Sequence, residues 1–263
     1  MLLAKSCQKK YNIKNGTIKL GTLYEYRSIE NDELIDKQEG MLTFNLNFRG
    51  NVEVPPEWFA TISGGGMATG RIAPLRFPGR QSSHFIKVEF AEISEHRVVL
   101  RDSSAVFSHE SLNSFIFCVS RVRRTTDCVG IFTGCDDYWY IPEARARAFA
   151  DRLGKTLLNH IIEGHNSGNP IIPQDIDVNS LEIAIEHRQV DYISRDINLY
   201  DNGALTLESF TQKMRNMAFT KPESYKAELE YRFNFIIISN GRIIEPLVKS
   251  VYLNSKELLE LVI

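Results

Sequence analysis

The chain has 263 residues, 43% of them hydrophobic and 24% charged, and its formal net charge at pH 7 is −2. This is the composition of a globular protein with enough apolar side chains for a large core. The weak negative charge argues against a protein that binds polyanions over its whole surface. Any nucleic-acid contact therefore has to come from a local basic patch.

No apolar segment approaches the ~20 residues that a membrane-spanning helix needs, and the N-terminal apolar stretch is too short for a signal peptide. We therefore expect a cytoplasmic protein that makes no membrane contact. The four cysteines form no CxxC pair, and the six histidines are scattered without metal-ligand spacing. We predict no metal site from this pattern.

Strands dominate the first half of the chain. Residues 17–29 are rich in β-branched and aromatic side chains and predict two short strands, or one bulged strand, broken at Gly21. Residues 31–40 are typical of an acidic, exposed turn. Period-two alternation predicts a strand at 41–48. Further strands are predicted at 85–93, 96–102, 114–120 and 129–141.

The clearest predicted helix covers residues 142–164. Pro142 suits the first helical position, and apolar side chains recur on one face at every fourth residue from Phe149 to Ile161. A second helix is predicted at 205–219.

The C-terminal part of the chain predicts a hairpin. A strand is expected at 181–193, and the apolar runs 228–239 and 243–253 flank Asn-Gly, which favours the tight turn between antiparallel strands. A short helix closes the chain at 254–263. Because strands do not alternate regularly with helices, we predict an α+β fold with mixed or mostly antiparallel sheets, in a single domain over residues 1–263.

Two carboxylates stand at the start of the strand predicted at 228–239. Residues i and i+2 of a strand share a face, so Glu228 and Glu230 are expected to point the same way, with Arg232 following them. Paired carboxylates at the edge of a core suit chemistry that develops positive charge, such as glycosidic cleavage. The alternative is a solvent-facing strand end with one exposed ion pair.

This Glu-x-Glu motif resembles the catalytic motif of ADP-ribosyltransferases, which cleave NAD between nicotinamide and ribose. The resemblance implies a split sheet, NAD as substrate, and Glu230 and Glu228 as catalytic residues. Four further positions match the family's order of site residues and are implied to bind NAD: Arg27 in LGTLYEYRSI, Ser120 in NSFIFCVS, and Tyr138 and Tyr140 in DDYWYI. For Arg27, an ion pair with one of the acidic residues that follow it is the alternative. For the two tyrosines, the alternative is a place in the core.

The layout of LGTLYEYR, FIFCVS and FTKPESYKAELEYRF also resembles bacterial abortive-infection proteins of phage defence. Toxins of this type are neutralised by an antitoxin, which the resemblance implies as a partner.

Residues 58–88 contain no Asp or Glu but carry Arg71, Arg76 and Arg80. This segment is either an exposed connector or a loop that contacts the phosphates of a nucleic-acid target.

Three functions follow from these patterns. The first is an ADP-ribosyltransferase toxin that modifies a cellular target, with RNA as the favoured target. The second is an NAD-hydrolysing defence enzyme with the same site and water as acceptor. The third is a non-enzymatic nucleic-acid-binding or sensor protein, in which the arginine segment carries the function.

Overall fold

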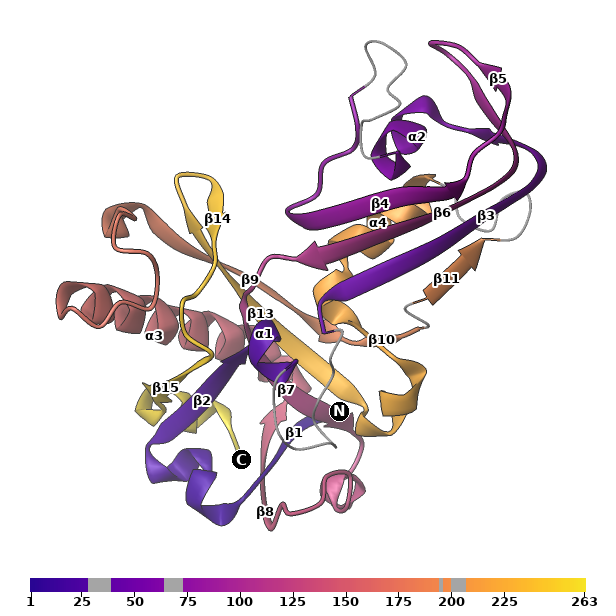
Figure 1. Cartoon of the computed structure of the whole chain (residues 1–263). Helices are drawn as coiled ribbons and strands as arrows, with labels where there is room; N and C mark the ends of the chain where they lie inside the picture. Colours follow the sequence, from indigo (N-terminus) through magenta and orange to yellow (C-terminus); the bar gives the residue numbers. More distant parts are fainter. Residues whose placement is uncertain (28–38, 64–72, 194–195, 200–206) are drawn as a thin grey trace. The chain divides into compact units, whose positions relative to one another are not determined.

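The computed structural model describes residues 1–27, 39–63, 73–193, 196–199 and 207–263. They form an α+β fold with mostly antiparallel sheets and few helices, which confirms the predicted fold class (Figure 1). No helix in these ranges is long and apolar enough to cross a membrane.

The chain divides into two compact units that are interleaved along the sequence. Unit 1 comprises Met1–Glu39, Asn113–Tyr192 and Lys221–Ile263, and unit 2 comprises Gly40–Leu112 and Ile193–Thr220. The chain therefore passes between the units four times, which explains why the sequence contains no recognisable linker. The single domain predicted for residues 1–263 stays a prediction, because a domain is defined by folding on its own and not by compactness alone.

Unit 1 is built on one eight-stranded sheet whose pairings are antiparallel. Its strands are β1 (Leu2–Cys7), β2 (Thr17–Thr22), β7 (Phe115–Val122), β8 (Asp137–Pro142), β9 (Leu181–Gln189), β13 (Glu230–Ser239), β14 (Arg242–Ile244) and β15 (Ser250–Asn254).

The sheet of unit 1 divides at β7. One edge of β7 pairs with β13, while the other edge is shared by two strands. Strand β1 pairs with residues 120–122, and β2 pairs with residues 115–116. The middle of β7, around Cys118, therefore lies between two strands that diverge from it. This local geometry places β1, β7 and β13 side by side at the end of the sheet where the Glu-x-Glu motif lies.

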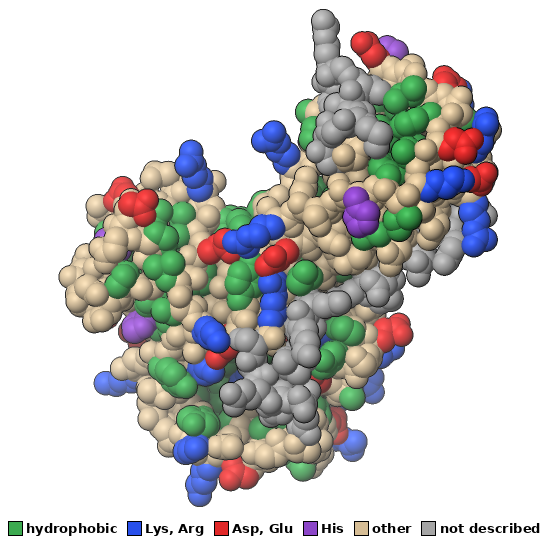
Figure 2. Space-filling model, in the orientation of Figure 1, with side chains coloured by type: hydrophobic (Ala, Val, Ile, Leu, Met, Phe, Trp, Pro, Cys, Tyr) green, Lys and Arg blue, Asp and Glu red, His purple; other side chains and the backbone are tan. Residues whose placement is uncertain are grey.

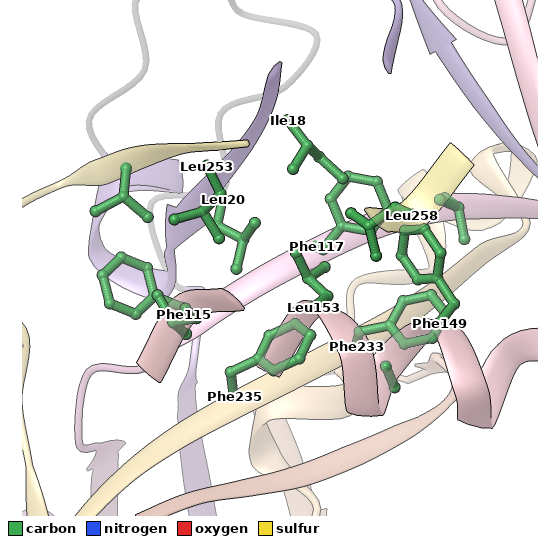
Figure 3. Close-up of a cluster of buried hydrophobic side chains, with 14 of the residues drawn as sticks. Ile18, Leu20, Phe115, Phe117, Phe149, Leu153, Phe233, Phe235, Leu253 and Leu258 are labelled. Atoms are coloured by element: carbon green, nitrogen blue, oxygen red, sulfur yellow. The ribbon is translucent and has the colours of Figure 1, made fainter. Parts of the chain in front are cut away.

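Helix α3 (Ala146–Asn166) packs on this sheet and closes the core of unit 1 (Figures 1 and 3). The periodicity of the predicted helix 142–164 is confirmed, since Phe149, Leu153, Leu157 and Ile161 are all fully buried. The ring of Phe149 lies 5.7 Å from that of Phe233 on β13. Removing side chains of this size from water is the main stabilising contribution of the helix.

The turn of the predicted hairpin is also confirmed, but its second strand is shorter than predicted: β14 covers Arg242–Ile244, while residues 250–254 form β15 and pair with β2. Strand β13 pairs with β14 from Ser239 opposite Arg242, which leaves a two-residue loop. Both loop residues have positive φ, 50° at Asn240 and 72° at Gly241, as the tight turn requires.

Unit 2 contains a five-stranded sheet with two helices and its own core. The sheet consists of β3 (Met41–Val54), β4 (Gly79–Lys87), β5 (Phe90–Ile93), β6 (Val98–Ser111) and β11 (Asp196–Leu199), and the helices are α2 (Pro56–Ile62) and α4 (Leu207–Arg215). Strand β11 pairs in parallel with β3, and the other pairings are antiparallel. Phe210 of α4 is fully buried in this core against Phe44 and Phe107.

Short elements complete the chain. Strands β10 (Asp191–Tyr192) and β12 (Thr220–Lys221) pair with each other. A four-residue helix, α1 (Leu23–Tyr26), follows β2. The 3-10 helices are Lys9–Tyr11, Ile13–Asn15, Thr125–Cys128, Glu143–Arg145, Val178–Ser180, Met217–Phe219, Glu223–Glu228 and Lys256–Leu261.

Several sequence predictions differ from the structure; the strand predicted at 129–141, for example, is present only as β8, Asp137–Pro142. Strand β2 ends at Thr22, whose hydroxyl accepts a hydrogen bond from the Glu25 N–H and caps α1, so residues 23–26 are helical where a strand was expected. The segment 58–88 is not one loop, since it holds most of α2 and all of β4. Strand β1 was not predicted at all.

Candidate functional site

A cavity of about 510 Å³ lies in unit 1 at the end of the sheet where β1, β7 and β13 meet. Its charged lining consists of Lys5, Glu39, Lys221, Glu228, Glu230 and Arg232, and Ser120, Cys118, Tyr11, Tyr26 and Phe132 are among its other walls. Its volume lies in the range of pockets that hold small organic ligands. All lining residues belong to unit 1.

The register of β7 and β13 places the polar side chains on one face of the sheet. Glu230 lies opposite Ser120, and Arg232 lies opposite Cys118. Because alternate residues of a strand share a face, these four side chains point to the same side. Ala4 of β1 pairs with Ser120 from the other edge, so three neighbouring strands form the floor of the site.

Glu228 also lines this cavity, but it belongs to a different element from the one predicted. It ends the 3-10 helix Glu223–Glu228 and is not part of the strand, which begins at Glu230. Leu229 between them has φ 51°, in the left-handed region that non-glycine residues rarely adopt. This turn residue brings the two carboxylates together at one point although they belong to different elements.

The two carboxylates converge on a buried ammonium group. Lys221 Nζ lies 2.5 Å from Glu228 Oε2 and 3.0 Å from Glu230 Oε2. The other oxygen of Glu230 accepts a hydrogen bond of 2.7 Å from Arg232 Nε. Arg232 also donates from Nη1 to Glu39 Oε1 at 2.7 Å. The result is a continuous chain of alternating charges with three carboxylates and two cations.

All five members of this charge chain are buried. The exposed fraction is 1% for Arg232 and Glu39 and 8% for Glu228, the most exposed of the five. Burying an ion is costly unless each charge has a partner, and removing one partner leaves another charge uncompensated. Such an arrangement is weak evidence for stability, and ionisable groups perturbed in this way inside a cavity mark a candidate functional site.

The pKa values of the two carboxylates are shifted in opposite directions. Burial alone would raise the pKa of Glu230, but the Arg232 guanidinium and the Lys221 ammonium outweigh it and hold that pKa well below its usual range. Burial raises the pKa of Glu228 to about 7, although the Lys221 ammonium opposes the shift. Glu230 is therefore charged at neutral pH, while Glu228 exchanges a proton near neutrality.

Cys118 is not a nucleophile at neutral pH. Loss of solvation, together with the Glu230 carboxylate beside it, raises the pKa of the Cys118 thiol to about 12. The thiol stays protonated, and only a thiolate attacks carbon centres efficiently. Cys118 is therefore excluded as the nucleophile of this cavity.

Three of the site residues predicted from the sequence line the cavity: Glu230, Glu228 and Ser120. Arg27 caps α1 and is not among the lining residues. Its Nε donates to the backbone oxygen of Glu39 at 2.7 Å, and its guanidinium lies 4.1 Å from the ring centre of Tyr24. In this structure Arg27 holds the backbone that carries Glu39.

Tyr138 and Tyr140 lie on β8, opposite Ser6 and Ala4 of β1. They share the face of the sheet that carries Ser120, but they pack with Cys128 in a small apolar cluster and do not line the cavity. The Tyr140 hydroxyl donates to the Thr125 backbone oxygen.

The predicted nucleic-acid contacts belong to unit 2. Arg76 is exposed, and Arg80 lies on β4 with Nη1 3.8 Å from Glu110 Oε1. Arg71 lies outside the described residues. On the face shown in Figure 2, the Lys and Arg side chains of the described residues are interspersed with Asp and Glu and do not gather in one basic patch.

The sequence analysis missed three charged residues of the site, namely Lys5, Glu39 and Lys221. Glu39 falls in the segment predicted as an exposed acidic turn, yet it is buried against Arg232, 193 positions away in the chain. Lys221 lies seven residues before Glu228, in the stretch KPESYKAELE. A lysine close to two glutamates was the one sequence signal that pointed to this ion pair.

Among the residues that the structure describes, no three His, Cys, Asp or Glu side chains gather as metal ligands would. In comparisons with protein families, curated proteins and solved structures, nothing matches this chain.

Proposed function

We propose that the protein cleaves NAD between nicotinamide and ribose and transfers ADP-ribose to a cellular acceptor. The observation that carries this proposal is the pair Glu228 and Glu230, which converge in one cavity with their pKa values shifted apart. Two neighbouring carboxyl groups with separated pKa values are the pattern by which a site divides charge stabilisation from proton transfer.

Glu230 is the charge-stabilising residue of this proposal. As the bond between C1′ of ribose and the nicotinamide nitrogen breaks, its electron pair passes to nicotinamide, and positive charge develops on the ribose ring. Lys221 and Arg232 hold Glu230 in its ionised form. Its carboxylate accepts a hydrogen bond from a ribose hydroxyl and faces the developing charge in a water-poor cavity. Fixed charge of this kind stabilises the transition state more than the ground state.

Glu228 is the proton acceptor. The lone pair of the acceptor's oxygen or nitrogen forms the new bond to C1′, and the proton released from that atom passes to the Glu228 carboxylate. A pKa of about 7 suits this step, because the group is partly ionised at neutral pH and binds the proton readily.

For the acceptor we propose a nucleic acid, with RNA favoured, on the strength of the acid-free segment 58–88 and its exposed Arg76. Because the Glu-x-Glu stretch resembles that of abortive-infection toxins, we further propose that the protein acts in phage defence. An antitoxin that blocks the cavity would then be its partner.

The test is to incubate the purified protein with NAD labelled in its adenosine part and with separate pools of RNA, DNA and protein. The heat-denatured protein is the control. Label retained by the RNA pool supports the proposal as stated, and label in another pool corrects the acceptor. Loss of NAD with no label in any pool identifies water as the acceptor and a hydrolase. No loss of NAD under any condition contradicts NAD cleavage.

A further inference from the structure

The residues at three of the four passages between the units contact the same two residues of β13. Glu39, the last residue before the first passage, holds Arg232. Lys221, the first residue after the fourth passage, holds Glu230. Tyr192, the last residue before the third, accepts a hydrogen bond of 2.7 Å from the Glu230 N–H.

The remaining passage is built differently. Its first residue in unit 1 is Asn113, whose N–H donates to Glu245 Oε2 at 2.9 Å and whose side-chain oxygen accepts from the Tyr24 N–H. Neither partner belongs to the charge chain. A passage between the units therefore does not have to contact Glu230 or Arg232, although three of the four do.

These three contacts fix both the backbone and the side chain of Glu230. Tyr192 holds its N–H, and Lys221 holds one carboxylate oxygen. Glu39 acts one step further away, because it fixes the guanidinium that holds the other oxygen. A displacement of the segments leading to unit 2 would thus move the partners of both oxygens and of the backbone.

We propose that unit 2 regulates the cavity of unit 1 through Glu39, Tyr192 and Lys221, which act as positioning residues for Glu230. This inference rests on the proposed function, since it names the control of that same site. A change in unit 2 displaces the chain at three passages, and each of these passages ends at a contact with Glu230 or with Arg232, which holds Glu230. Few-residue connections that absorb a motion are the usual hinges of such control.

The physical content of the proposal is a coupling free energy between unit 2 and the start of β13. The test needs no assumption about the chemistry: substitutions destabilise the core of unit 2, and the rates of amide hydrogen exchange are measured in unit 1. Phe107→Leu alters a fully buried ring of β6, and Leu100→Val is a second, milder variant in case the first does not fold. Leu258→Val is the matched control, since it alters a fully buried side chain of unit 1 in the 3-10 helix Lys256–Leu261, which contacts α3.

In the unit 2 variants we expect the amides of β3 and β6 to exchange faster than in the parent. The amides of residues 230–232 should then also exchange faster, by at least several-fold. Amides of α3 should exchange at the parent's rate. Leu258→Val should leave residues 230–232 unchanged. Loosened β3 and β6 strands with unaltered exchange at 230–232 would overturn the coupling.

The second arm measures NAD cleavage in the same variants. The proposal predicts that kcat falls several-fold in Phe107→Leu and Leu100→Val with little change in KM, because substrate contacts remain while Glu230 loses its alignment. Unchanged kcat despite faster exchange at 230–232 would overturn control of the site. If the parent itself cleaves no NAD, the proposed function fails, and the exchange result still decides the coupling.

Discussion

Lys221 is the residue on which the electrostatics of the cavity depend most directly, because its ammonium serves both carboxylates of the Glu-x-Glu motif. An ion pair at the surface contributes little, whereas a charge left buried without its partner is strongly destabilising. The two effects predict different results for the two lysines of this segment, since Lys226 is exposed.

We predict that Lys221→Met lowers the free energy of unfolding at pH 8 by about 3–5 kcal/mol, and that Lys226→Met leaves it nearly unchanged. The loss for Lys221→Met should shrink as the pH falls toward 5. Without the ammonium, the pKa of Glu228 rises further above that of the unfolded chain. A raised folded-state pKa contributes stability at low pH that is lost as the pH rises through it. Denaturant titrations between pH 5 and 8 provide the measurement, and an equal loss at every pH would show that the carboxylates are not buried with Lys221.

Arg27 and Glu39 show why the residue scale is the hardest to predict from sequence. Nothing local distinguishes Glu39 from the acidic residues before it, and its burial depends on Arg232 across the fold. Arg27 was matched to an NAD-binding position by its expected place on an early strand, but it caps α1, and its Nε donates to the Glu39 backbone oxygen. Its role in holding NAD stays a prediction.

At the scale of elements, the turn at Leu229 determines whether Glu228 and Glu230 meet. A left-handed conformation costs a residue with a side chain roughly 1–2 kcal/mol, more if the side chain is β-branched, and costs glycine little. Leu229 is also partly exposed, so its side chain contributes little burial.

We therefore predict that Leu229→Val lowers the free energy of unfolding by about 1 kcal/mol and reduces NAD cleavage, because the strained turn releases Glu228 from Lys221. Leu229→Gly should stay within about 1 kcal/mol of the parent and keep its activity, since the relief of strain offsets the greater freedom of the unfolded chain. Thermal unfolding and NAD turnover of both variants test this. Equal activity of the two variants would show that the turn does not position Glu228.

Elements with strong local signals were predictable. Helix α3 has an unbroken apolar face, and the hairpin of β13 and β14 has the Asn-Gly turn, so local and global preferences agree there. Helix α1 was missed because LYEY has β-propensity, and the Thr22 cap overrides it. For the site, the pair Glu228 and Glu230 and the neighbouring Ser120 could be placed from sequence, whereas Lys221 and Glu39 come together only through tertiary structure.

For the whole molecule, the question is whether unit 2 contributes a surface that binds the nucleic-acid target. The acid-free composition of 58–88 is a property of the sequence, but Arg80 has Glu110 as an acidic neighbour on β6. Phosphate contacts are additive and sensitive to salt, whereas binding in the cavity of unit 1 depends on enclosed groups.

We predict that Arg71→Ala, Arg76→Ala and Arg80→Ala together lower modification of a nucleic-acid target several-fold, with a larger effect at moderate than at low salt. Binding of NAD should remain that of the parent. A triple variant with the same loss of charge in unit 1, at the exposed Lys14, Lys155 and Lys256, is the control and should transfer normally. Transfer and NAD binding are measured side by side across a salt series. An unchanged transfer rate of the arginine variant at every salt concentration would assign residues 58–88 a purely structural role.

In the proposed reaction, Glu230 stabilises the positive charge that develops as NAD is cleaved. Release of nicotinamide from NAD, measured for the parent, for Glu230→Gln and for Glu223→Gln, tests it most directly. Glu223 is an exposed carboxylate at the start of the 3-10 helix that ends at Glu228, and it is the matched control. We predict that Glu230→Gln, shown to be folded by its near-UV circular dichroism, releases nicotinamide slower by at least a hundredfold, on the order of the loss of one oxyanion-hole donor, while Glu223→Gln keeps the parent's rate. Nicotinamide release at the parent's rate from folded Glu230→Gln would contradict the claim.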